Sequence, residues 1–261
     1  MAKIRISRRK VYREALRTYI RMARTLITRI DKHFNKFRRY SFKEYSEIGY
    51  IRDKYYEDYW ADLYKIMEKN ARTIIADSSR FIKTSRMLKK ADDEVAQVTY
   101  DYVTQNTAQN VTYITETTRK QIQKAIAYSI SEGLGQDDTA EQIAKSTAFS
   151  SARSKVIART ETHQAYNYGN NKIAKGLALR KPMKEWLSAG DMRTRWWHKN
   201  MDNRKPVPIN ESFVVNTPIA GGQVIPVNME MTGDSNGGAS NVVNCRCFTM
   251  YYDAEDVLID D

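Results

Sequence analysis

Helix-breaking residues are confined to one half of this 261-residue chain. Residues 1–132 contain no proline and a single glycine, Gly49, whereas all five prolines and the other ten glycines lie beyond residue 132. Both residue types disfavour the interior of a helix, so their absence favours long helices. We therefore predict that the first half of the chain is helical and that its last third consists of short strands and loops.

The spacing of apolar residues predicts where individual helices lie. Apolar side chains recur every three or four positions over residues 9–39, which is typical of one face of a helix. Ser41 followed by Glu44 reads as a capping box and predicts a second, tyrosine-rich helix after it. We expect its tyrosines to pack against a neighbouring helix rather than form an aromatic interface. Further helices are expected near Asp92, over 117–131, from Thr139, and over 151–175.

Beyond Pro182 the apolar runs become short and are interrupted by proline, glycine and asparagine. Short strands are expected at 186–187, 207, 213–215, 223–225 and 248–252. The sequence therefore predicts an α+β protein in three parts. These are a mainly helical arm or bundle over 1–116, a compact domain of helices and a small β-sheet over 117–253, and an acidic tail over 254–261 that frays.

Positive charge is concentrated at the start of the chain. The first forty residues contain fourteen basic and two acidic residues, whereas the rest contains twenty-nine of each. A localised basic block usually faces a polyanion, and we favour non-specific contact with double-stranded DNA. The residues expected to make it are Arg13, Arg17, Arg21, Arg24, Arg29, Lys32, Lys36 and Arg39. Two alternatives stay open: a solvated face of a helix that docks on a protein through Leu16, Ile27 and Ile30, and binding to an anionic membrane surface.

The sequence also bears on the compartment. Only two cysteines occur, Cys245 and Cys247, so a disulfide framework is not expected and a reducing environment is the natural interpretation. No apolar core of a signal peptide and no apolar run of membrane-spanning length is present. We expect synthesis in a cytoplasm and no transmembrane segment.

Several motifs follow one another in a fixed order over residues 117–253. They include IARTETHQAYNYG, then KEWLSAGDMRTRWWHKNMD, then TGDSNGG and NCRC. This ordered set resembles the Mu F-like minor head proteins of tailed bacteriophages, also called head morphogenesis proteins. The residues that match the family pattern are Arg159, Thr160, Glu161, Trp186, Asp191, Arg193, Arg195, His198, Asp202, Asp234, Asn244, Cys245, Arg246 and Cys247. The chain departs from the pattern at Asn203 and Ser235, where the family has glycine and proline.

The resemblance implies a low-copy component inside the capsid head, near the portal vertex, that acts in procapsid assembly or in genome packaging and ejection. The implied partners are the portal protein and packaged DNA, with scaffold or major capsid protein as further candidates. Some relatives carry a toxin or protease domain after NCRC, and none is expected here. The resemblance does not include the basic segment, whose interpretation depends on charge alone.

Two chemical alternatives involve the matched region. Cys245 and Cys247 with His198 or His163 could form a metal site, but C-x-C is a poor chelate, so two buried thiols and no cofactor are favoured. A metal-dependent nuclease or transferase could use acid–base groups at Glu161, His163, Asp191, His198 and Asp202, with Arg159, Arg193 and Arg195 holding phosphate. We favour a non-enzymatic protein in which the motif residues are structural.

Overall fold

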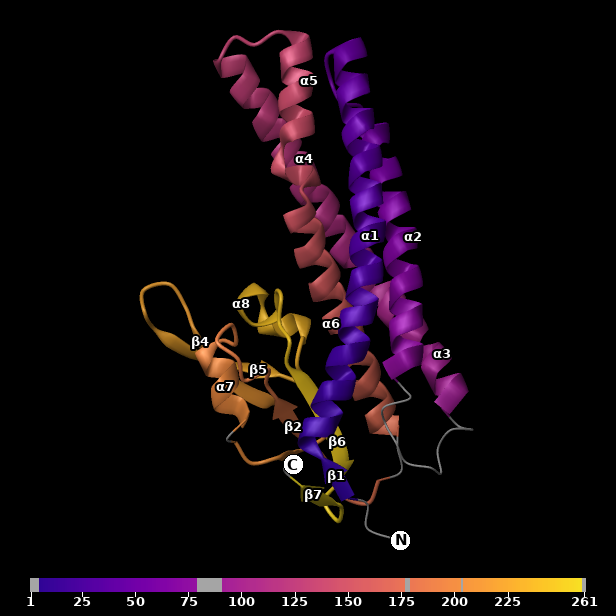
Figure 1. Cartoon of the computed structure of the whole chain (residues 1–261), viewed down its shortest axis with the longest axis vertical. Helices are drawn as coiled ribbons and strands as arrows, with labels where there is room; N and C mark the ends of the chain where they lie inside the picture. Colours follow the sequence, from indigo (N-terminus) through magenta and orange to yellow (C-terminus); the bar gives the residue numbers. More distant parts are fainter. Residues whose placement is uncertain (1–4, 79–90, 177–178, 203, 260–261) are drawn as a thin grey trace. The chain divides into compact units, whose positions relative to one another are not determined.

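The computed structural model describes residues 5–78, 91–176, 179–202 and 204–259 (Figure 1). The chain forms two compact units, and each is assembled from separated segments. Unit 1 comprises Met1–Met22, Ala71–Tyr102 and Arg159–Asp261, and unit 2 comprises Ala23–Asn70 and Val103–Ala158. Long helices together with small sheets confirm the predicted α+β class. The linear division of the chain at residues 116 and 253 stays a prediction.

Helix α1 spans Arg8–Ile48 and is longer than the sequence predicts. The capping box expected at Ser41 is wrong, because the Ser41 hydroxyl donates to the Arg38 carbonyl oxygen at 2.9 Å and the side chain is buried within the helix. A serine hydroxyl inside a helix can donate its hydrogen bond to a backbone carbonyl oxygen one turn earlier, so it does not need to lie at the start of a helix. The apolar stripe also continues from Phe37 to the buried Tyr45. The helix continues to Ile48 and the chain leaves it at Gly49, where the φ of +75° is a conformation that favours glycine.

The remaining long helices follow the predicted order with shifted starts. Helix α4 begins before residue 117, and α5 begins before Thr139, whose hydroxyl donates to the Gly135 carbonyl oxygen from within the first turn. Both starts lie in segments without strong capping signals, so local sequence marks them poorly. The helices are α2 (Asp53–Ser78), α3 (Ala91–Tyr102), a π-helical turn (Val103–Thr107), α4 (Ala108–Ser131), α5 (Gln136–Lys145) and α6 (Ser151–Gly176). No helix of the described ranges is long and apolar enough to cross a membrane.

Unit 2 has a core built largely from aromatic side chains. Phe34, Phe37 and Tyr59 are fully buried or nearly so, and the ring centroids of Phe37 and Tyr59 lie 5.2 Å apart. The predicted packing role is confirmed for Tyr45, Tyr55, Tyr56 and Tyr59, which belong to this core, whereas Tyr50 is 57% exposed. Ile30 is fully buried in the same core and Ile27 packs against it. The alternative in which these two isoleucines dock on another protein is therefore wrong.

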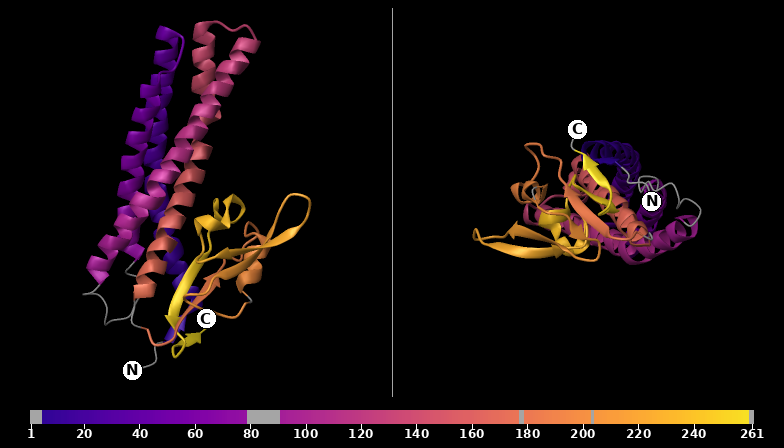
Figure 2. Two further views of the ribbon diagram at one scale, coloured as in Figure 1. Left: turned by 180° about the vertical axis from the view of Figure 1, so that it is seen from behind. Right: turned by 90° about the horizontal axis from the view of Figure 1, so that it is seen from below.

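Unit 1 carries the strands. Strands β3 (Val207–Pro208), β2 (Pro182–Leu187) and β6 (Phe248–Asp253) form an antiparallel sheet in that order, and β4 (Phe213–Pro218) pairs with β5 (Val224–Met229) as a hairpin. The left view of Figure 2 shows this sheet and this hairpin from the side opposite to that of Figure 1. Two short helices, α7 (Trp196–Asp202) and α8 (Ala239–Val242), lie between strands, and the sequence patterns did not indicate either.

The end of the chain differs from the prediction. Residues 257–259 form strand β7 (Val257–Ile259), which pairs in parallel with β1 (Arg5–Ser7), so this part of the expected fraying tail is ordered. The pairing joins segments from opposite ends of the sequence, which local sequence patterns do not reveal. The predicted acidic tail therefore contributes an element of unit 1.

Strand β2 separates two small apolar clusters. Successive side chains of a strand point to opposite faces, so Trp186 and Leu187 enter different clusters. Trp186 packs with the two cysteines, Met201, Phe213, Val215, Met229 and Val242. Leu187 packs with Met250 and Tyr252, and with Val11 and Tyr12 of α1. The first turns of the basic helix are thus part of unit 1.

Candidate functional site

Three of the motif residues converge in the interior of unit 1. The ligand-type atoms of His198, Cys245 and Cys247 all lie within 4.8 Å of one another, and all three side chains are buried. His198 Nδ1 lies 3.6 Å from Cys245 Sγ and 3.5 Å from Cys247 Sγ. From the sequence, either His198 or His163 could complete a metal site with the two cysteines. The structure places Nδ1 of His198 near both sulfur atoms.

Local backbone geometry explains why both cysteines point inward. Asn244 has a φ of +59°, a left-handed conformation that asparagine tolerates better than most residues, and Cys245 follows directly. The backbone N–H of Cys247 then approaches Cys245 Sγ at 3.5 Å. Residues two apart in an extended segment face the same way, so the two sulfur atoms share one side. Arg246 between them points the other way.

A chain of buried hydrogen bonds determines how the His198 ring is protonated. The amide nitrogen of Asn241 donates to Thr217 Oγ1 at 2.9 Å and to the Gly237 carbonyl oxygen at 2.8 Å. Asn241 Oδ1 must therefore be the acceptor, and Trp197 Nε1 donates to it at 2.8 Å. His198 Nε2 lies 3.1 Å from the same oxygen and so carries the proton. The lone pair of a neutral His198 ring then lies on Nδ1, which faces the sulfur atoms.

The two thiols differ in acidity. A hydrogen bond from the Cys247 thiol lowers the pKa of Cys245 well below its ordinary value, with further contributions from His163 and His198. Burial raises the pKa of Cys247 well above its ordinary value.

Arg246 and Asp191 form a clamp on the outer side of this segment. Arg246 donates two hydrogen bonds to the Asp191 carboxylate, each 2.7 Å long. Asp191 also accepts from the backbone N–H of Arg193 and from the hydroxyl of Thr194. The bonds from Arg246 hold the pKa of Asp191 well below its usual range. Bidentate pairs fix orientation, so the clamp holds the loop before α7 against the cysteine segment.

Other motif residues also contact backbone. Thr160 Oγ1 accepts from the Asn244 N–H at 3.1 Å, and Arg195 donates to the Val243 carbonyl oxygen at 2.6 Å. Asp234 accepts from the N–H groups of Glu230 and Asn236. Arg159 and Arg193 are exposed, and Glu161 is half-buried. Asn203, the departure from the family pattern, lies outside the described residues.

Gly233 has a steric reason to be glycine. Its φ is +77°, and a Cβ at this position would lie 2.7 Å from Nδ1 of the buried His163. The His163 ring in turn lies 2.5 Å from the Cys247 carbonyl oxygen through Nε2, which therefore donates. His163 thus supports the backbone of the cysteine segment and also interacts with the Cys245 thiol, while Nδ1 of His198 lies near both sulfur atoms.

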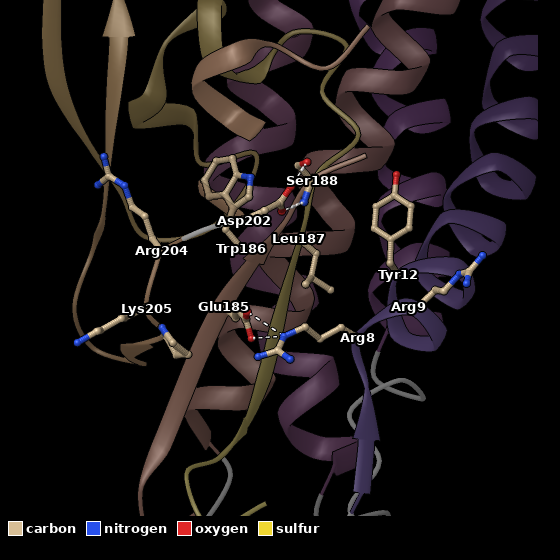
Figure 3. A pocket seen from close by; sticks show the side chains of 11 residues that line it. Arg8, Arg9, Tyr12, Glu185, Trp186, Leu187, Ser188, Asp202, Arg204 and Lys205 are labelled. Atoms are coloured by element: carbon tan, nitrogen blue, oxygen red, sulfur yellow. Dashed lines mark hydrogen bonds and ion pairs between the residues drawn. The ribbon is translucent and has the colours of Figure 1, made fainter. Parts of the chain in front are cut away.

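The proposed acid–base groups do not converge on the pocket that described residues of unit 1 line. A pocket of about 530 Å³ is lined by Trp186, Asp202, Glu185 and several basic residues (Figure 3). Of the five acid–base candidates, Asp202 alone is among the residues that line this pocket in the described part of the chain. Asp202 accepts from the backbone N–H of Ser188 at 2.6 Å and from its hydroxyl. This arrangement ties the end of α7 to β2.

The pocket has a basic lining. Arg8, Arg9, Arg204 and Lys205 contribute to it, and Arg8 Nε donates to both carboxylate oxygens of Glu185 at 2.9 and 3.1 Å (Figure 3). Arg204 donates to the Val214 carbonyl oxygen. Four basic residues against the two carboxylates of Glu185 and Asp202 leave the lining with a net positive charge.

Sequence reasoning missed Asn241, Glu185 and the buried Lys184. Lys184 Nζ donates to the Glu230 carbonyl oxygen at 2.6 Å, and burial lowers its pKa to about 8. Asn241 sits three residues before NCRC and could have been noticed as part of that motif. Neither Lys184 nor Glu185 had a spacing signal, because their partners are remote in sequence.

Comparison with known proteins connects this constellation to a family. Residues 120–250, half of the chain, match the model of the family described as phage Mu protein F like protein. The chain therefore belongs to this family, as the motifs predicted. It is 33% identical over 132 residues to the minor head protein GP7 of Bacillus phage SPP1. The aligned region covers 50% of this chain and 39% of that relative, so the chain spans well under half of its length. No solved structure matches. These findings support a phage minor head protein.

Proposed function

We propose that this chain is a structural, non-enzymatic minor head protein that lies inside the phage head near the portal and contacts packaged double-stranded DNA without sequence preference. It acts in procapsid assembly, genome packaging or ejection. Family membership supports the head role, and the charge of α1 carries the proposed DNA contact. The portal is the expected protein partner, with scaffold or major capsid protein as further candidates.

The basic residues of α1 share one side of the helix. At 100° per residue, the eight residues predicted to bind DNA fall within an arc of about 160°. The buried residues Ala23, Leu26, Ile30, Phe34 and Phe37 lie on the opposite side. All eight basic side chains are exposed except Arg29, which is half-buried. A stripe of exposed cations suits the backbone of a polyanion, since phosphate contacts need no base recognition.

Most of this charge is available to an external partner. Arg21 donates to Asp77 at 2.7 Å, and Lys36 pairs with Asp62, so these two cations are partly neutralised within their own units. The other six predicted residues form no ion pair with any residue that the structure describes. The basic lining of the pocket, with Arg9 and Lys205, adds charge of the same sign near the start of α1.

The test is the salt dependence of DNA binding by the full chain. Replacing Arg24, Lys32 and Arg39 with glutamine removes three cations from the α1 face in unit 2. The slope of log affinity against log salt concentration should become shallower by up to about 2.7, or roughly 0.9 for each phosphate that the variant no longer neutralises. The matched control replaces Lys120, Lys124 and Lys155, which are exposed on α4 and α6 in the same unit.

Both triple variants lose the same net charge, so a general charge effect changes both slopes equally. The proposal requires that the α1 variant has a shallower slope while the control keeps the wild-type value. An unchanged slope in the α1 variant would show that DNA contacts another surface.

A further inference from the structure

The cluster of His198, Cys245 and Cys247 has the ligand set of a site for a thiophilic divalent metal. Two sulfurs and one imidazole nitrogen are typical zinc ligands. All three come from the interior of unit 1, where Cys245 and Cys247 are each 2% exposed and His198 is 1% exposed. The sequence alone favours two buried thiols, because C-x-C is a poor chelate. The structure adds that Nδ1 of His198 lies near both sulfurs.

The two sulfur–nitrogen distances within the cluster fit one tetrahedral ion, and the two sulfur atoms lie within 4.8 Å of each other. With Zn–S near 2.3 Å and Zn–N near 2.05 Å, tetrahedral angles separate the sulfur and nitrogen atoms by about 3.6 Å. The observed distances from His198 Nδ1 are 3.6 Å to Cys245 Sγ and 3.5 Å to Cys247 Sγ.

The surroundings of the cluster resemble the outer shell of a metal site. Metal-bound histidines usually donate their other ring nitrogen to a fixed acceptor, which sets the tautomer. Here His198 Nε2 is satisfied by Asn241 Oδ1, whose own orientation is fixed by Thr217 and Gly237. The backbone N–H of Cys247 approaches Cys245 Sγ, which is the kind of donor that stabilises a thiolate ligand. The imidazole lone pair is therefore directed at the sulfurs before any ion arrives.

Charge balance favours an ion over two thiolates alone. The cysteines lie in an apolar cluster with Trp186, Phe213 and Val215, where an isolated charge is strongly disfavoured. Two thiolates, a neutral imidazole and one Zn²⁺ together carry no net charge, so the complex is compatible with this environment. Binding releases the two thiol protons.

We propose that His198 Nδ1, Cys245 Sγ and Cys247 Sγ bind one Zn²⁺ ion that stabilises unit 1. The ion joins α7 to the segment that leads into β6, and these lie more than forty residues apart in sequence. The small apolar cluster around the ligands would then be reinforced by metal–ligand bonds, as in other small cores.

The experiment measures the metal content of the full chain, purified without a metal-charged resin. Mass spectrometry of the metals should find about one zinc per chain. Replacement of zinc by Co²⁺ should give the visible bands of tetrahedral cobalt together with a sulfur-to-cobalt charge-transfer band. Cys245→Ser, Cys247→Ser and His198→Gln should each lose zinc. His33→Leu is the matched control, since it removes a buried histidine from unit 2 and should keep full zinc content.

The wild-type measurements keep the proposal falsifiable even where a variant fails to fold. Removal of zinc by a chelator should lower the melting temperature, and added Zn²⁺ should restore it. A folded, zinc-free wild-type chain that neither binds added Zn²⁺ or Co²⁺ nor changes its melting temperature would overturn the proposal. So would a Cys245–Cys247 disulfide found in the native chain under reducing conditions.

Discussion

Different kinds of interaction stabilise the interior of unit 1 and the interior of unit 2. Unit 2 is a set of helices around aromatic and aliphatic side chains, such as Phe34, Phe37 and Tyr59. Unit 1 has smaller apolar clusters, divided by β2, and links its loops through buried polar side chains such as Asn241 and Asn167. The comparison indicates that packing dominates the stability of unit 2, whereas hydrogen-bond geometry sets the structure of unit 1.

The largest expected effect comes from removing packing in unit 2. Phe37 is fully buried, so Phe37→Ala should lower the free energy of unfolding by about 3–5 kcal/mol through reduced burial and a cavity. Urea titration followed by circular dichroism measures the change. Tyr128→Ala on the exposed side of α4 is the control and should change stability by no more than about 0.5 kcal/mol. Equal effects of the two substitutions would contradict a packing-dominated unit 2.

A smaller effect is expected from one polar side chain in unit 1. Asn241→Ala removes the acceptor for Trp197 and His198 and the donor to Thr217. Leaving buried polar groups unpaired should cost roughly 1–3 kcal/mol. The comparison is with Asn216→Ala on β4, whose side chain is exposed. If Asn241→Ala were as mild as Asn216→Ala, the polar network would not determine the structure of unit 1.

A third test measures how the stability of unit 2 depends on pH. His33 is buried among Phe34, Phe37 and Tyr59, and this burial lowers its pKa from 6.5 to about 3. Between these values the unfolded chain binds a proton that the folded chain does not, so stability falls as pH drops from 6.5 toward 3. The slope due to His33 is at most about 1.4 kcal/mol per pH unit. His33→Leu should remove this component, measured as the difference between variant and wild-type stability across that range. Parallel pH profiles would show that His33 is not held neutral.

The same contrast explains what could be predicted from sequence. Helical periodicity marked the buried face of α1 and the tyrosines of α2, because in unit 2 burial follows the local repeat. The capping box predicted from Ser41 and Glu44 is wrong, because the Ser41 hydroxyl donates to a carbonyl oxygen one turn earlier within α1 instead of capping the start of a helix. In unit 1 the motifs identified the family and the residues NCRC, but not their arrangement. The meeting of His198 with Cys245, and of Asp191 with Arg246, depends on tertiary contacts that one sequence does not contain.

The family assignment and the basic face of α1 concern different parts of the chain. The matched region begins at residue 120, whereas the predicted DNA contacts lie between residues 13 and 39. A head protein of this design joins a domain that matches the family to a cationic helix that lies outside the matched residues. The two roles can therefore be separated by experiment.

The most direct test of the account is retention of the portal subunit of the same phage by the immobilised full chain, with and without nuclease treatment. The portal should be retained in both conditions, because the proposed tether is a protein contact and DNA binds independently. Loss of the portal after nuclease treatment, or no retention in either condition, would contradict a portal-associated head protein.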